Sequence, residues 1–166
     1  MVGDMRLQDR LVDYIEDAHA MEENVLRTLD TLIATTDDKE VGALLRSHRQ
    51  ETEGQLELLH GRLRAHHHAS SGRKDVPMIC AALLKGIADR ARRDKAVKNG
   101  RDAFTIEHME IATYEILERI ADRAGDFRTA EVARSNRRQE EEMARHIAAA
   151  WDRFFALTLR DEGLTA

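Results

Sequence analysis

A set of acidic and histidine side chains interrupts the apolar faces of the predicted helices, close to the middle of each one. The set comprises Glu22, His48, Glu51, Glu107, Glu110, Glu142 and His146. Burying an uncompensated carboxylate costs several kcal/mol, and like charges placed together raise that cost. Carboxylate and imidazole groups are also the ligands that suit Fe, Mn and Zn. The pattern therefore predicts divalent metal ions bound inside a helical protein.

The apolar stripe of each helix places these residues. Glu22 lies four residues after Ala18 and three before Val25, so it shares their face. Glu107 and Glu110 are one turn apart, and their carboxylates are expected on one surface. Acids from all four long helices would then meet at one depth.

Polar residues come in runs in the second and fourth helices. His48, Glu51 and Gln55 follow one another at helical spacing, with leucines before and after them. In the fourth helix the inward track is expected to pass through Glu142 and His146. Both helices are therefore predicted to present polar groups to the interior at mid-length.

The composition predicts helices almost throughout, because the chain has a single proline and is rich in Ala, Leu, Glu and Arg. Apolar periodicity places helices at about residues 5–34, 39–66, 78–91, 101–124 and 127–159. Thr36 or Asp37 is placed to cap the second helix. The 166 residues are expected to form a single domain. Two helical hairpins joined by a connection of about 30 residues predict a ferritin-like, antiparallel four-helix bundle, whose one long crossover carries an extra short helix.

Charge and composition argue against several kinds of partner. A net charge of −5 with both signs interspersed does not suit nucleic acid binding, and no apolar run approaches the roughly 20 residues that span a bilayer. Because Cys80 is the single cysteine and no signal sequence is recognised, a cytoplasmic location is expected. Apolar surface on the crossover helix favours a homodimer.

The segments around these polar residues resemble the YciE/YciF-type family, bacterial stress-associated proteins of the ferritin-like superfamily whose activity is largely unassigned. They are DAHAMEE at 17–23, HRQETEGQ at 48–55, IEHMEIATY at 106–114 and EEEMA at 140–144. The resemblance covers nearly the whole chain. The second and third segments are its most specific part.

The resemblance implies that the five glutamates named above occupy the ferritin-like metal positions, with His48 and His146 as nitrogen ligands. Two departures from the superfamily pattern of Glu-x-x-His stand out. Gly54 lies three residues after Glu51, and His146 lies four residues after Glu142 instead of three. A histidine-poor, a weakly occupied and a vestigial site all remain open.

Two functions compete on this evidence. The first is a dinuclear Fe or Mn carboxylate centre that reduces oxygen or peroxide and oxidises Fe(II) in a stress response, which would make the protein an oxidase or peroxidase-like enzyme. The second is a non-enzymatic, dimeric helical interaction protein whose buried polar residues form a metal-free network. Iron storage in a cage is a third reading. Tyr114, one turn after Glu110, is interpreted as a core aromatic residue with a satisfied hydroxyl, with hydrogen bonding to a ligand or a redox role as alternatives.

Overall fold

The computed structural model describes residues 2–67 and 93–164, and in these ranges the chain forms helices and turns without any strand. The helices are α1 (Val2–Ala34), α2 (Lys39–Ala65), α4 (Lys95–Arg123), α5 (Phe127–Ala149) and α6 (Trp151–Asp161). The expected all-α fold is confirmed. The short helix expected at about 78–91 lies outside the described residues.

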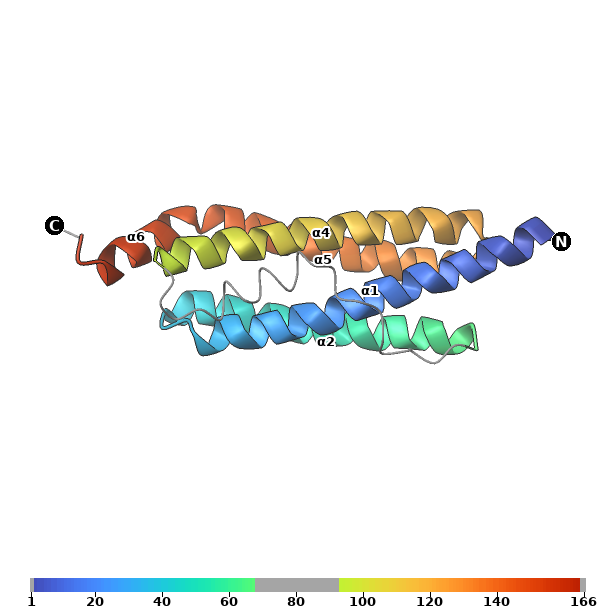
Figure 1. The fold of residues 1–166 in the computed structure, drawn as a ribbon, viewed down its shortest axis with the longest axis horizontal. Coiled ribbons are helices and arrows are strands. Elements are labelled where there is room, and N and C mark those ends of the chain that lie inside the picture. Colours follow the sequence, from blue (N-terminus) through green and yellow to red (C-terminus); the bar gives the residue numbers. More distant parts are fainter. Residues whose placement is uncertain (1, 68–92, 165–166) are drawn as a thin grey trace.

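The helices form an antiparallel four-helix bundle made of two hairpins (Figure 1). Residues 35–38 join α1 to α2, and residues 124–126 join α4 to α5. The hairpins lie side by side, with α1 against α4 and α2 against α5. α2 and α4 begin at the same end of the bundle, so α2 ends at the opposite end from the start of α4 (Figure 1). This arrangement of helices is the one found in ferritin-like bundles with a single long crossover.

Aspartates cap the helices that follow the two tight turns. Asp38 accepts hydrogen bonds from the backbone N–H groups of Glu40 and Val41 at the start of α2. Asp126 accepts one from the N–H group of Thr129 at the start of α5, directly after Gly125, whose φ of +73° is a conformation that favours glycine. The expected cap at Thr36 or Asp37 is therefore wrong by one or two residues.

The core is a continuous cluster of leucine, isoleucine, valine and alanine side chains that runs along the bundle axis. Its fully buried members include Leu11, Ile15, Leu59, Leu63 and Leu117. Each buried aliphatic side chain stabilises the fold by roughly 1.5–3 kcal/mol relative to an exposed one. The stability that this packing supplies can offset the cost of burying polar groups in the middle of the bundle.

Two helix boundaries differ from those expected from the sequence. The fourth predicted helix is divided at Ala150, whose N–H group bonds to the carbonyl of Ile147, and the chain continues as α6. This change of direction brings Phe154 against Gly100, where a Cβ atom would lie 2.7 Å from the ring. The third long helix begins at Lys95 instead of about 101, because its polar first turns pack against α6. There the Val97 N–H group donates to Thr158 Oγ1 at 3.1 Å.

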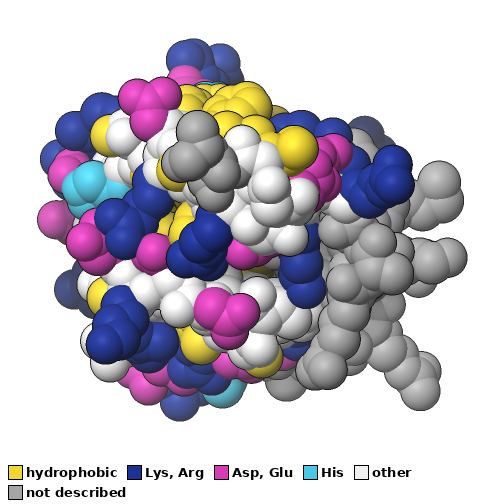
Figure 2. All heavy atoms as spheres, turned by 90° about the vertical axis from the view of Figure 1, so that its left-hand side faces the viewer, with side chains coloured by type: hydrophobic (Ala, Val, Ile, Leu, Met, Phe, Trp, Pro, Cys, Tyr) yellow, Lys and Arg dark blue, Asp and Glu magenta, His cyan; other side chains and the backbone are white. Residues whose placement is uncertain are grey.

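The end of the bundle that holds α6 has a mixed surface. Figure 2 shows charged side chains of both signs around it, with hydrophobic side chains gathered along its upper edge. Phe155 and Leu159 on α6 are 55% and 42% exposed. Within the described ranges, no helix combines the length and apolarity needed to cross a bilayer.

Candidate metal centre

Four carboxylates and one imidazole lie buried in the middle of the bundle. They belong to Glu22 on α1, His48 on α2, Glu107 and Glu110 on α4, and Glu140 on α5. None of these residues is more than 2% exposed. All four helices of the bundle therefore contribute to one polar cluster.

The side chains of the cluster lie close enough together that they could hold a metal ion. His48 Nε2 lies 3.4 Å from Glu107 Oε1 and 3.6 Å from Glu140 Oε2. One ligand atom from each of His48, Glu107, Glu110 and Glu140 can be chosen so that all lie within 4.8 Å of one another. A cation placed among them would reach every one with small side-chain movements.

Neighbouring polar groups hold the outer oxygens of two of the carboxylates. The Tyr114 hydroxyl donates to Glu22 Oε1, and Asn136 Nδ2 donates to the Tyr114 oxygen at 3.1 Å. Gln55 Nε2 donates to Glu140 Oε1. These bonds orient the two carboxylates and leave their other oxygens facing the cluster.

The inner atoms have no hydrogen-bond partner among the described residues. They are Glu22 Oε2, Glu107 Oε2, both carboxylate oxygens of Glu110, Glu140 Oε2 and both ring nitrogens of His48. Most buried polar atoms in folded proteins have a partner, and a buried acceptor without one costs about 1–3 kcal/mol. Converging carboxylate oxygens without hydrogen-bond partners, beside an imidazole, could hold a metal ion, because carboxylates and imidazoles are metal ligands in proteins.

Burial changes the acidity of the carboxyl groups. Desolvation raises the pKa of Glu22 to about 7 and that of Glu140 to about 9. It also raises the pKa of Glu110 well above its usual range, with the nearby charge of Glu140 acting in the same direction. The raised pKa values favour the protonated forms of these groups, so metal ions and protons would compete for the same oxygens.

The pKa of the His48 imidazole is raised even though the side chain is buried. Desolvation alone lowers the pKa of His48, but the carboxylates of Glu107 and Glu51 outweigh it and raise this pKa to about 11. A metal-free cluster therefore contains an imidazolium surrounded by acids. As a ligand His48 would have to be neutral, and its proton would be released on metal binding.

The structure brings together four of the residues proposed from the sequence. These are Glu22, His48, Glu107 and Glu110. In each case the apolar stripe of the helix placed the side chain on the correct face.

The other three candidates lie outside the buried cluster. Glu51 is 43% exposed, with Oε2 at 3.5 Å from His48 Nδ1, so it borders the cluster from outside. Glu142 and His146 are 55% and 53% exposed and lie 3.6 Å apart on the surface of α5. The expectation that Glu142 and His146 face the interior is wrong, because the buried face of α5 runs through Glu140 instead.

Glu140 is the cluster member that the sequence reading missed. It lies seven residues after Ala133 and seven before Ile147, both of which are buried. This heptad spacing was the available signal. Small alanines mark the inner face of α5 only weakly. The sequence therefore predicted a neighbouring row of residues, through Glu142 and His146, as the inner one.

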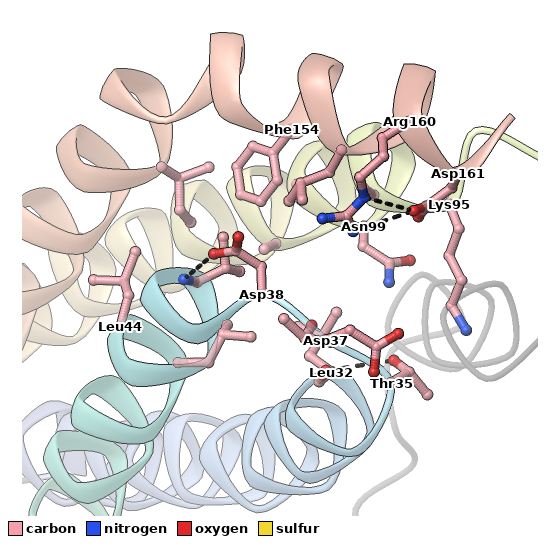
Figure 3. Close-up of a pocket in the computed structure, with 18 of the residues that line it drawn as sticks. Leu32, Thr35, Asp37, Asp38, Leu44, Lys95, Asn99, Phe154, Arg160 and Asp161 are labelled. Carbon is pink, nitrogen blue, oxygen red and sulfur yellow. Dashed lines mark hydrogen bonds and ion pairs between the residues drawn. The ribbon is translucent and has the colours of Figure 1, made fainter. Parts of the chain in front are cut away.

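A pocket of about 70 Å³ lies away from the buried cluster, at the end of the bundle where the α1–α2 turn meets α4 and α6. Figure 3 shows Phe154 reaching into it from α6, while Lys95, Arg160 and Asp161 lie near its mouth. It shares no lining residue with the buried cluster. The buried cluster is therefore separate from this pocket.

The fold and the buried cluster define a ferritin-like four-helix bundle whose carboxylate and histidine side chains could hold a metal ion. The chain belongs to the family described as Domain of unknown function (DUF892), whose model matches residues 6–157. The similarity to the YciF type is thereby confirmed.

Individual relatives agree with this assignment. Protein YciF of Escherichia coli (strain K12) is 27% identical over 143 residues, which cover 81% of this chain and 83% of that protein. The solved structure of protein XCC3681 from Xanthomonas campestris pv. campestris has a TM-score of 0.79 at 23% identity, covering 96% of this chain and 99% of that one. The structure of the E. coli stress protein YciF has a TM-score of 0.78 at 17% identity, covering 90% of this chain and 97% of that one. The two structures share the fold described above.

Proposed function

We propose that this protein binds two divalent transition metal ions, Fe or Mn, in the buried cluster, and that it reduces oxygen or peroxide while oxidising Fe(II). The similarity to a protein described as an E. coli stress protein supports a role in a stress response, and we extend this proposal to protection against oxidants. The proposed ligands are Glu22, His48, Glu107, Glu110 and Glu140. Two observations carry the proposal. His48, Glu107, Glu110 and Glu140 offer ligand atoms within 4.8 Å of one another, and the inner oxygens of the four glutamates accept no hydrogen bond from the described residues.

Charge supports two ions over one. Four ionised carboxylates carry a charge of −4, and His48 as a ligand is neutral. Two divalent cations balance that charge, whereas one leaves two negative charges in a site of low polarity, where uncompensated charge is costly. Bound Fe or Mn would supply the redox electrons for reduction of the oxidant.

The residues of the chain prepare the site in three ways. Tyr114 and Gln55 fix the orientation of Glu22 and Glu140 by donating to their outer oxygens. Glu107 and Glu110 present two carboxylates from one helix face, one turn apart. The surrounding aliphatic core excludes water, which strengthens the attraction between carboxylates and cations.

The runner-up is a metal-free polar network in a protein that acts by binding a partner. The hydrogen bonds from Tyr114 to Glu22 and from Gln55 to Glu140 favour it, since they give one oxygen of each buried acid a partner without any cation. On this alternative the cluster would specify the packing of the bundle and hold protons instead of cations.

Elemental analysis and oxygen uptake distinguish the two functions. The purified protein is dialysed against Fe(II) or Mn(II) without oxygen, desalted and analysed, and oxygen consumption is then followed on addition of Fe(II). The proposal predicts about two ions per chain and Fe(II)-dependent oxygen uptake. Only trace metal and no uptake would leave the metal-free network.

Matched variants assign the result to the cluster. Glu110→Gln removes a ligand charge while keeping the shape, so it should lower the metal content and the oxygen uptake. Glu131→Gln is the same change on the exposed surface of α5 and should alter neither. Equal behaviour of the two variants would contradict binding at the cluster.

A further inference from the structure

A groove of about 720 Å³ opens between α2 and α5 beside the buried cluster. The residues that line it include Glu51, Gly54 and Gln55 on α2 and Asn136 and Gln139 on α5. At Gly54 the wall has no side chain, and a Cβ atom built there would meet no other heavy atom within 4 Å. The groove is therefore open to solvent at the level of Gly54.

Two buried amides separate the groove from the metal cluster. Gln55 and Asn136 line the groove and are each only 1% exposed. Gln55 Nε2 donates both to Gln139 Oε1 on the wall, at 2.9 Å, and to Glu140 Oε1 in the cluster. A single side chain thus connects the groove to a proposed metal ligand.

The oxygens of these amides have no partner. Gln55 Oε1 and Asn136 Oδ1 are buried and accept no hydrogen bond from the described residues. Carbonyl and amide oxygens can replace part of the hydration shell of a divalent cation. The floor of the groove therefore offers oxygen ligands between solvent and cluster.

Glu51 supplies the negative charge at the same place. Its half-exposed carboxylate lines the groove, and its Oε2 lies 3.5 Å from His48 Nδ1. It therefore borders solvent on one side and the cluster on the other. A smaller adjoining pocket adds Glu142 beside Glu51, while Arg64 and Arg138 lie in the outer walls.

We propose that the groove between α2 and α5 is the passage by which divalent cations reach the cluster, with Glu51 as the receiving carboxylate and Gln55 as the side chain that must move to admit them. This inference rests on the proposed metal site and assigns it an entrance. It also gives a role to Glu51, which lies outside the ligand cluster. A passage changes the rates of metal loading and release equally, and leaves the equilibrium affinity unchanged.

Stopped-flow absorbance with Co(II) as the probe tests the passage. The metal-free wild-type protein is mixed with Co(II) to measure loading, and the loaded protein with a chelator to measure release. In Gly54→Leu the new side chain would project from the groove wall and obstruct the groove. The rates of Co(II) loading and release should therefore fall together. Gly61→Leu is the matched control, because Gly61 is on the same helix, has equal space for a side chain and does not line the groove. It should load at the wild-type rate.

A second variant tests the charge. Glu51→Gln should load Co(II) about tenfold more slowly at low ionic strength, because a charged cleft raises the rate of cation entry by roughly that factor or more. The difference from wild type should shrink as salt is added.

The outcomes distinguish the proposed passage from the proposed metal site. If wild type binds Co(II) but Gly54→Leu loads and releases it as fast as wild type, the passage is wrong and the metal site stands. A lower equilibrium affinity of Gly54→Leu at unchanged loading rate would also overturn the passage. If wild type does not bind Co(II) at all, the metal site fails and the passage fails with it.

Discussion

Tyr114 is the side chain that links the cluster to the rest of the core. It is fully buried, it donates to Glu22 Oε1, and it accepts from Asn136. The interpretation of this residue as a core aromatic with a satisfied hydroxyl describes what the structure contains. The alternative of hydrogen bonding to a ligand stays a prediction, which depends on Glu22 binding metal as proposed.

Removing the hydroxyl should affect both stability and metal affinity. In Tyr114→Phe, Glu22 Oε1 and the Asn136 amide lose their partner, so the free energy of unfolding should fall by about 1–3 kcal/mol. Loss of a partner that orients a ligand lowers metal affinity by about 10–100-fold. Urea denaturation and Co(II) titration measure the two effects. An unchanged affinity would show that Glu22 is not held as a ligand.

The burial of a polar residue could be predicted from the sequence only where large apolar side chains lie before and after it on the same helix face. Glu22 lies between Ala18 and Val25 on a stripe that also holds leucines, and its burial follows directly. Around Glu140 the buried residues of α5 are mostly small or polar, such as Ala133, Asn136 and Ala144, and such residues occur on either side of a helix. Exposure of Glu142 and His146 became evident only when α5 was placed against α2 and α4.

At the scale of the elements, α4 and α6 approach each other closely at one glycine. Phe154 packs on the backbone of α4 at Gly100, where a Cβ atom would approach ring carbons to within 2.7–3.0 Å. The sequence did not reveal this contact, because residues 94–100 are polar and Phe154 was expected on a continuous helix. The bend at Ala150 depends on packing between distant segments, which local periodicity does not encode.

Two glycine substitutions separate this contact from helix propensity. Gly100→Ala should destabilise the protein by about 1–3 kcal/mol through overpacking against Phe154. Gly61→Ala has free space around its Cβ and should stabilise the protein by up to about 1 kcal/mol, because alanine favours the helix. Thermal unfolding of both variants measures the difference. Stabilisation by both would show that α6 does not pack as described.

At the scale of the whole molecule, the cluster should make stability depend on pH. The pKa values of Glu22 and Glu140 are raised to about 7 and about 9, and that of His48 to about 11. A group whose pKa is raised in the folded state stabilises it below the unfolded pKa, and this stabilisation is lost as pH rises through the folded value. All three groups therefore act in the same direction between pH 5 and pH 9.

We expect the free energy of unfolding of the metal-free protein to fall from pH 5.5 to pH 9. Bound cations replace the protons, so Mn(II) should restore stability most strongly at the high end of this range. Urea denaturation at several pH values, with chelator and with Mn(II), measures both trends. Constant or rising stability of the metal-free protein over this range would contradict the buried cluster of acids.

The class of fold was predictable from the sequence, because long helices with short turns and one long connection allow few arrangements. The homodimer stays a prediction. Light scattering would measure it, and the exposed Phe155 and Leu159 on α6 are where substitution by Glu should be tried first.

Anomalous X-ray scattering from crystals soaked in Mn(II) or Fe(II) tests the central claim most directly. We predict two anomalous peaks in the middle of the bundle, within coordination distance of Glu22, His48, Glu107, Glu110 and Glu140. Peaks confined to the surface at Glu142 and His146, or an absence of peaks in the bundle centre, would contradict the metal centre.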